Sequence, residues 1–345
     1  MQPSVTHGVV LGYGSVGKRH ARVLGSMVPT LVIMEVDAAA RLQAAADWPE
    51  ARVAPALAEL DGWVPWAEVM AVIATWGPSH ASLFHALADR GVRRILCEKP
   101  MAASVRDAAG MVARAERDGI VIGVHHVVRY GGLAPALRTL AERLELGAPV
   151  AVVVDGGAAC LVTNGTHWLD FAIELLDAEP VAVCSTATGA PINPRSPTLM
   201  IYGGTAVYSF PGGRELTLTL STGSSAALST RVYYRNAVAE IDGDLNICLR
   251  GRDAAAVARF PAVTRTGAVS VVLASGTLPG VIGYLEGMRE ALDDVRLGRP
   301  RCTGAMGATV VGGCIGALVA ARERREVALP MAPDSAWGGE AWPIS

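Results

Sequence analysis

Two lysines are the residues of this sequence that most directly suggest chemistry. Of the 30 basic residues in the 345-residue chain, only Lys18 and Lys99 are lysines. Arginine serves equally well as a solvated charge but cannot lose its proton in a protein, whereas a partly buried lysine can exchange protons near neutral pH. Lys99, in Cys97-Glu98-Lys99-Pro100, is therefore the first candidate catalytic residue. The alternative is that a composition biased toward arginine left two lysines by chance.

A glycine-rich segment near the start of the sequence predicts a dinucleotide-binding loop. An apolar run at 8–11 leads into a G-x-G-x-x-G pattern that opens a helix. In such a loop the first glycine permits a tight turn, the second lets the backbone approach a pyrophosphate, and the third lets the helix pack on the strand. The alternative is a purely structural turn. The residues expected to contact the cofactor are Gly12, Tyr13, Gly14, Ser15, Val16 and Gly17.

An acidic residue indicates which dinucleotide is bound. The second apolar run, 31–34, ends at Glu35, about twenty residues after the loop. A carboxylate there accepts hydrogen bonds from an adenosine ribose and repels a 2′-phosphate. The sequence therefore predicts NAD in preference to NADP.

The elements that position these residues follow from the apolar pattern. Through the first 125 residues short apolar runs alternate with alanine-rich helical segments, which is typical of a doubly wound parallel sheet. Strands are expected at 8–11, 31–35, 70–75, 95–97 and 121–124, with helices at 18–24 and 82–90. Residues 74–80 and 97–100 each follow a strand, so both lie at the carboxyl edge, where ligands of such sheets bind.

From about residue 150 the pattern changes to successive strands. Residues 214–220 have a period of two that places three leucines on one face and two threonines on the other, as in a half-buried strand. Two further runs, 237–241 and 245–249, flank Asp242-Gly243-Asp244, which is a hairpin signal. The second domain is therefore expected to be an open, mainly antiparallel sheet.

The fold class expected is α/β with two domains, since a chain of this length usually divides. We expect a Rossmann dinucleotide-binding domain over residues 1–125 and a substrate-binding and oligomerisation domain over 126–345. Helices predicted at 283–297 and 309–322 are expected to pack onto the second sheet.

Composition excludes several classes of function. A net charge of −2 gives no basic surface for nucleic acid. The six cysteines contain no C-x-x-C pair, which argues against bound metal and against disulfides and indicates small core residues in a reducing compartment. No signal-peptide pattern precedes the first strand, so a cytoplasmic location is expected. The uncharged stretch 304–321 is built from glycine and alanine, which favours a buried helix over a membrane span.

In combination these motifs resemble the Gfo/Idh/MocA family of dehydrogenases. The resemblance rests on the G-x-G-x-x-G-x-x-H start, the turn containing Pro78 and His80, the triplet at 98–100 and the segment 165–170, and it extends from Gly8 to about Pro330. It implies a Rossmann domain joined to an open-sheet substrate domain. It also implies activity on sugars, cyclitols or nucleotide-linked sugars.

The resemblance assigns roles at matching positions. Lys99 matches the active-site lysine between nicotinamide and substrate, and His167 matches the histidine that usually serves as acid and base. Residues matching the lining of the cofactor site are Thr75, Trp76, Pro78, His80, Glu98 and Lys99. Residues expected at the substrate are Lys99, His126, Arg129, Tyr130, Thr163, Asn164 and His167. His126 is included because His125 and His126 lie just before the domain junction, although core packing is the commoner fate of such residues.

The chemistry of alcohol oxidation supports His167 and Lys99 independently. Hydride transfer from an alcohol requires removal of the hydroxyl proton, so a group that titrates near neutrality must touch that oxygen. His167 is predicted in the first turn of a helix capped by Asn164 or Thr166, where the positive helix end favours the neutral ring. The alternative is a capping or packing histidine. Asp170, further along this helix, is expected to be structural.

One position departs from the family pattern. The aspartate expected four residues before the histidine is Thr163 here, and a threonine cannot stabilise an imidazolium as a carboxylate does. The sequence therefore predicts a proton relay without the usual aspartate.

The leading interpretation is an NAD-dependent dehydrogenase or ketoreductase for a polyhydroxylated small molecule, acting as a homodimer or homotetramer. A non-catalytic nucleotide-sensing protein of the same fold is the alternative from another class. A third is cleavage of a glycosidic bond through transient redox chemistry. No nucleic-acid or membrane partner is expected.

Overall fold

The chain folds into two compact units in a computed structural model, which describes residues 5–157, 159–190, 198–259, 261 and 270–344. The first unit comprises Met1–Gly131, Ile282–Val311 and Ala332–Ser345, and the second comprises Gly132–Val281 and Gly312–Met331. This division differs from the expected boundary at residue 125, because two later segments return to the first unit.

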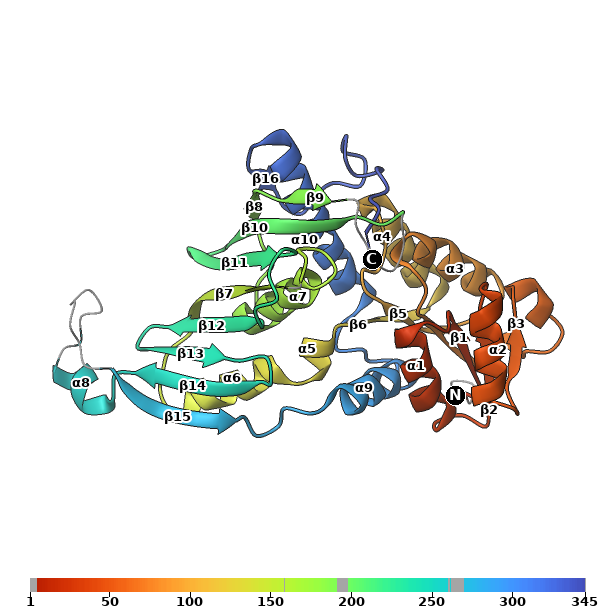
Figure 1. Cartoon of the computed structure of the whole chain (residues 1–345), viewed down its shortest axis with the longest axis horizontal. Coiled ribbons are helices and arrows are strands. Elements are labelled where there is room, and N and C mark those ends of the chain that lie inside the picture. The colour runs from red at the N-terminus through yellow and green to blue at the C-terminus, as the bar shows by residue number, and fades with distance from the viewer. Residues whose placement is uncertain (1–4, 158, 191–197, 260, 262–269, 345) are drawn as a thin grey trace. The chain divides into compact units, whose positions relative to one another are not determined.

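The first unit is built on a six-stranded sheet (Figure 1). Its strands are β1 (His7–Leu11), β2 (Thr30–Met34), β3 (Arg52–Ala54), β4 (Val69–Ile73), β5 (Arg94–Glu98) and β6 (Val121–His125). All pairings are parallel, and the order β3-β2-β1-β4-β5-β6 reverses between β1 and β4. The doubly wound Rossmann sheet is thereby confirmed, and ligands of such sheets bind at the carboxyl ends beside that reversal. The sequence pattern missed β3, which is only three residues long.

Helices of the first unit connect and cover these strands. They are α1 (Ser15–Gly25), α2 (Ala38–Asp47), α3 (Gly77–Asp89), α4 (Val105–Asp118), α5 (Val127–Tyr130) and α9 (Tyr284–Arg296), with short 3-10 turns η1 (Leu57–Leu60) and η2 (Trp66–Glu68). All five residues of β4 are buried, which explains its uninterrupted apolar sequence.

The packing of α9 corrects one expectation. This helix lies against α1, β5 and β6 of the first unit, whereas the sequence predicted that it packs onto the second sheet. Its apolar stripe, Met288, Leu292 and Val295, is fully buried. A Cβ atom on Gly123 of β6 would lie 2.7 Å from the Val295 side chain, so the glycine lets helix and strand approach closely.

The second unit is built on a ten-stranded mixed sheet. Its strands are β7 (Pro149–Gly157), β8 (Ala182–Ser185), β9 (Thr188–Ala190), β10 (Ile201–Phe210), β11 (Arg214–Ser221), β12 (Ser229–Tyr234), β13 (Ala237–Ile241), β14 (Asn246–Gly251), β15 (Val271–Thr277) and β16 (Val327–Ala328). Only the β7–β11 pairing is parallel among those described. Helices α6 (Leu133–Arg143), α7 (Gly165–Leu176) and α8 (Ala254–Arg259) belong to the same unit.

The predicted alternation in β11 is confirmed. Leu216, Leu218 and Leu220 are at most 1% exposed, while the intervening threonines lie on the other face. Helix α7 packs against β7 and β11. One strand boundary differs from the prediction, because Leu245 adopts a φ of +62° within the β13–β14 turn and β14 begins at Asn246. The Asp242 carboxylate stabilises this turn by accepting N–H bonds from Asp244 and Asn246, both at 2.9 Å.

Helix α10 (Gly304–Glu323) contains the uncharged stretch 304–321 of the sequence. It is long and apolar enough to cross a bilayer, yet 72% of its most apolar window is buried within the protein, as in the core helix of a globular protein. All six cysteines carry free thiols. Cys184 is exposed and Cys248 half-buried, so the expectation that all six are core residues was wrong for these two. Cys184 is exposed because it alternates with the buried Val183 along β8.

Candidate active site

The glycine-rich loop between β1 and α1 has the geometry that its sequence predicts. Gly12 has a φ of +94°, and a Cβ atom there would lie 2.8 Å from the carbonyl oxygen of Ala74. A Cβ atom on Gly17 would lie 2.0 Å from the carbonyl oxygen of Gly12, so only glycine allows α1 to pack so closely. A Cβ atom on Gly14 would meet no described atom within 4 Å, which leaves room for a ligand above the first turn of α1.

Glu35 holds this loop from the end of β2. One carboxylate oxygen accepts the Tyr13 N–H at 2.5 Å, and the other accepts the Asp37 N–H at 2.8 Å. The Tyr13 hydroxyl donates to Asp47 at 2.9 Å. Burial, followed by this bond to Asp47, raises the pKa of Tyr13 to about 12. Because a carboxylate oxygen can accept more than one bond, Glu35 can brace the loop and still accept a ribose hydroxyl.

A charge that the sequence analysis did not single out lies beside Glu35. Arg41 of α2 donates from Nη1 to the carbonyl oxygens of Glu35 and Val36, at 3.0 and 2.6 Å. A guanidinium at this place is the group that accommodates a 2′-phosphate in other Rossmann folds. The feature of the sequence that could have revealed this charge is an arginine six residues after Glu35.

The loop after β4 is tied to the loop after β5 by His80. The ring of His80 is completely buried, with Nδ1 2.9 Å from the carbonyl oxygen of Pro100 and Nε2 3.0 Å from that of Thr75. Burial lowers the pKa of His80, against the opposing effect of these two carbonyls. His80 is therefore a buried link between the two loops.

The other residues of the β4–α3 loop lie nearer the surface. Thr75 and Ser79 share a hydrogen bond between their hydroxyls at 2.7 Å. Trp76 is 42% exposed and precedes the first turn of α3, which contains Pro78. An exposed tryptophan at the carboxyl edge of the sheet offers a flat apolar surface to a ligand.

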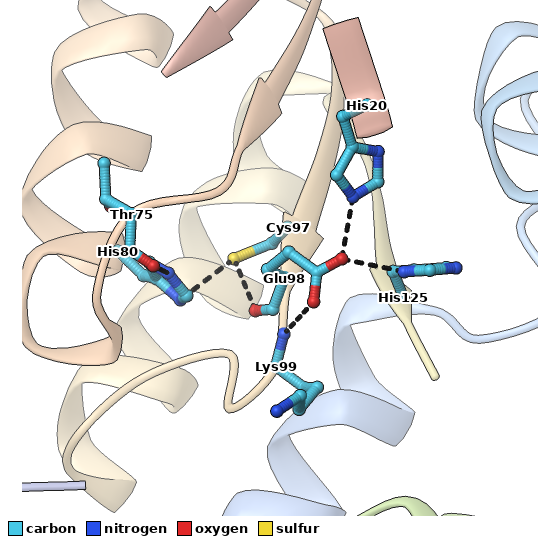
Figure 2. Close-up of polar contacts among 7 residues, drawn as sticks. All are labelled: His20, Thr75, His80, Cys97, Glu98, Lys99 and His125. Atoms are coloured by element: carbon cyan, nitrogen blue, oxygen red, sulfur yellow. Dashed lines mark hydrogen bonds and ion pairs between the residues drawn. The ribbon is translucent and has the colours of Figure 1, made fainter. Parts of the chain in front are cut away.

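Glu98, at the end of β5, lies in a cluster that sequence reasoning missed. Its Oε1 accepts from His20 Nε2 and from His125 Nδ1, both at 2.7 Å (Figure 2). The three residues come from α1, β5 and β6, and all are buried. Glu98 was expected to line the cofactor site, whereas its carboxylate is turned into this cluster. The sequence could have indicated this cluster, because Glu98 and His125 end neighbouring strands, where they are paired in register.

The cluster holds an ionised carboxylate away from water. Burial opposes ionisation of Glu98, but its interactions with His125 and His20 outweigh this effect and hold the pKa of Glu98 well below its usual range. Burial lowers the pKa of His20, although its bond to Glu98 acts in the opposite direction. We conclude that Glu98 is an anion and that His20 is neutral near pH 7.

Lys99 follows directly and is half-buried. Its backbone N–H donates to the second oxygen of Glu98 at 3.3 Å. Figure 2 shows its side chain directed away from the two histidines, while the backbone nitrogen faces Glu98. Lys99 therefore lies at the carboxyl edge of the sheet, as predicted.

Three expected substrate residues of the first unit are buried. His126, Arg129 and Tyr130 are each at most 5% exposed. Arg129 Nη1 is 3.5 Å from the carbonyl oxygen of Arg301, and the Tyr130 hydroxyl accepts the Cys302 N–H at 3.4 Å. Burial raises the pKa of Tyr130.

The remaining candidates belong to the second unit. His167 lies in the first turn of α7 and is half-buried, as are Thr163 and Asn164. The predicted cap was wrong: Asn164 occupies the N-cap position, but its side-chain oxygen accepts the Cys160 N–H at 3.0 Å and caps no helical amide. Thr166 lies within the helix, and Asp170 is completely buried.

The loop, the strand order and the acidic residue after β2 define a Rossmann unit of the kind that binds dinucleotides in oxidoreductases. Residues 7–126 match the family model described as "Oxidoreductase family, NAD-binding Rossmann fold". Over these residues the chain is similar to the Gfo/Idh/MocA family.

Individual relatives agree with this assignment. An inositol 2-dehydrogenase of Streptomyces avermitilis is 31% identical over 198 residues, which cover 50% of this chain and 54% of that protein. Alignments to the curated relatives cover between 19% and 54% of those proteins' lengths.

Solved structures match over nearly the whole chain. A UDP-N-acetylglucosamine 3-dehydrogenase from Acidithiobacillus ferrooxidans has a TM-score of 0.70 at 20% identity, covering 91% of this chain and 97% of that one. A levoglucosan dehydrogenase in complex with NADH has a TM-score of 0.71 at 18% identity, covering 95% and 100%. At these identities the likeness shows that both units share the fold of those enzymes.

Proposed function

We propose that the protein is an NAD-dependent oxidoreductase that acts on a hydroxyl or keto carbon of a sugar, cyclitol or nucleotide-linked sugar. The observation that carries this proposal is the placement of Lys99 at the carboxyl edge of the same sheet that presents the glycine-rich loop and Glu35. The relatives named above, which act on inositol and on sugars, support the substrate class.

The residues present fit a bound dinucleotide. Open space beside Gly14 and the amide groups of the first turn of α1 suit a pyrophosphate. Glu35 suits an adenosine ribose, and Trp76 offers an exposed ring at the edge. When bound, NAD would supply the hydride acceptor or donor.

The chain's own residues would handle the proton. Lys99 and His167 are the titratable groups that we assign to the substrate oxygen, with removal of the hydroxyl proton at Lys99 Nζ or at a His167 ring nitrogen during oxidation. Thr163 and Asn164 flank His167 in sequence and are assigned to substrate binding, together with His126, Arg129 and Tyr130. Thr163 stands where the family pattern has an aspartate, and a threonine cannot stabilise an imidazolium as a carboxylate does.

Self-association completes the proposal. The outward face of the open sheet carries half-exposed side chains such as Val153, Val207 and Tyr233. A homodimer or homotetramer would cover such a face. A cytoplasmic location remains a prediction.

The test uses purified protein with a panel of sugars, cyclitols and nucleotide-linked sugars, followed by the absorbance of reduced nicotinamide. Turnover of one class with NAD supports the proposal. Tight NAD binding without turnover of any compound in the panel would instead favour a non-catalytic nucleotide-sensing protein of the same fold.

A further inference from the structure

The cluster of His20, Glu98 and His125 is costly to bury. Besides the carboxylate, it contains two ring nitrogens, His20 Nδ1 and His125 Nε2, that are buried and have no hydrogen-bond partner in the described part of the chain. A buried polar atom without a partner lowers stability. Apolar side chains of similar volume often replace a buried charged cluster without loss of stability. Stability alone therefore does not explain why three polar side chains meet here.

The geometry of Glu98 offers an explanation. Its Oε1 is held by His20 from α1 and by His125 from β6, each at 2.7 Å. With Oε1 fixed from two directions, the carboxylate cannot rotate without breaking both bonds. Its other oxygen is thereby directed to the backbone N–H of Lys99, at 3.3 Å. Figure 2 shows this chain of contacts from the histidines to Lys99.

We propose that His20 and His125 are positioning residues that fix the backbone of Lys99 through the shared carboxylate of Glu98. Neither histidine is assigned to the substrate or the cofactor, so the role is separate from that of His167. The inference deepens the proposed function and rests on it for the catalytic meaning of Lys99. The arrangement itself can be tested without any substrate.

The two histidines use different ring nitrogens, which allows a crossed test. A glutamine amide nitrogen lies near the place of a histidine Nε2, and an asparagine amide nitrogen lies near that of Nδ1. His20 donates from Nε2, so His20→Gln should keep the bond to Glu98 and His20→Asn should lose it. His125 donates from Nδ1, so His125→Asn should keep the bond and His125→Gln should lose it. Glu98→Gln presents an amide with one donor atom and one acceptor atom. It should therefore disturb the hydrogen bonds to the two histidines and to the backbone N–H of Lys99.

Amine labelling provides the readout that needs no substrate. Because Lys18 and Lys99 are the only lysines of the sequence, an amine-reactive ester followed by peptide mass spectrometry reports the rate at Lys99 with exposed Lys18 as internal reference. We expect the ratio of the two rates to stay within about twofold of wild type in His20→Gln and His125→Asn. It should change at least about fivefold in His20→Asn and His125→Gln, which we call the swapped variants, and in Glu98→Gln. Melting temperatures confirm that each variant is folded.

Once a substrate is identified, kinetics provide a second readout. The swapped variants should lose about 10- to 100-fold in kcat, as expected for a small displacement of a reacting group, with the Kd for NAD within about twofold of wild type. A loss confined to NAD affinity would overturn the proposal, since it would mean that the cluster shapes the nucleotide site instead.

The outcomes separate this inference from the proposed function. Equal labelling ratios in all four histidine variants would overturn the inference, whether or not the protein turns over a substrate. A crossed pattern in a protein without turnover would support positioning of Lys99 while the oxidoreductase proposal failed. If a swapped variant does not fold, Glu98→Gln decides, because an unchanged ratio there overturns the inference.

Discussion

Gly17 lies so close to Gly12 that a Cβ atom on Gly17 would stand 2.0 Å from the Gly12 carbonyl oxygen. A methyl group there must push α1 away from β1. We expect Gly17→Ala to lower stability by about 1–3 kcal/mol, the usual cost of overpacking. Gly14→Ala is the matched control, because a Cβ atom there meets no described atom within 4 Å. It should leave the melting temperature unchanged but weaken NAD binding about tenfold, by occupying the space beside the pyrophosphate. Unimpaired NAD binding by Gly14→Ala would place the nucleotide elsewhere.

Cofactor choice should favour NAD. Glu35 places a carboxylate at the end of β2, and a 2′-phosphate facing it is electrostatically disfavoured. Arg41 beside it opposes this preference, so we expect Glu35→Gln to narrow the difference between NADP and NAD and Arg41→Gln to widen it. Titration calorimetry with both dinucleotides measures the ratio of the dissociation constants. Equal or tighter NADP binding by the wild-type chain would show that Glu35 does not face the ribose.

Lys99→Arg should separate binding from turnover. The substitution keeps the positive charge but removes the group that can exchange a proton, so we expect NAD binding to persist and kcat to fall by about two to four orders of magnitude. Lys18→Arg, at the other lysine of the sequence, is the control and should retain full activity. Near wild-type turnover of Lys99→Arg would favour the alternative that Lys99 is a lysine only by chance in a composition biased toward arginine.

His167 should control the acidic limb of the pH profile. With threonine at position 163, where the family pattern has an aspartate, and with the positive end of α7 nearby, its ring should remain neutral to lower pH than it would with an aspartate there. Thr163→Asp should move that limb upward, and His167→Ala should remove the limb with most of the rate. If Thr163→Asp leaves the acidic limb of the pH profile in place and His167→Ala stays active, Lys99 alone would be the residue that removes the hydroxyl proton.

Acid should destabilise the first unit. Burial lowers the pKa of His20 and of His80, so the unfolded chain binds more protons than the folded one below about pH 6.5. Stability is therefore fully present above that pH and is lost as the pH falls toward the folded-state values. Glu98, with its lowered pKa, acts in the same direction below about pH 4.5.

Calorimetric melting at pH 7.5, 6.0 and 5.0 measures this loss. His20→Gln should reduce the fall in melting temperature between pH 7.5 and 5.0, because its amide does not titrate. His85→Gln, a half-buried histidine of α3, is the control and should keep the wild-type slope. A melting temperature that rises on acidification would contradict the assignment of a neutral His20.

The sequence by itself determined five strands of the first unit and the nucleotide loop. Parallel strands covered on both faces must be apolar along their length, and so β1, β2, β4, β5 and β6 could be located from apolar runs. The roles of Gly12, Gly14 and Gly17 followed from local backbone geometry, which depends on neighbours in sequence. The alternation in β11 was equally local, since successive side chains of a strand point to opposite faces.

Only the tertiary structure decided which distant side chains meet. His20 and Glu98 are 78 positions apart, and their bond depends on the approach of α1 to β5. The return of α9 to the first unit depends on the fit of Val295 against Gly123, which no periodicity encodes. The Asn164 side chain bonds to Cys160 because a loop turns back on itself, where its position before the helix suggested a cap. Local patterns fix which face of an element is apolar, but partner choice depends on packing among elements that are separated in the chain.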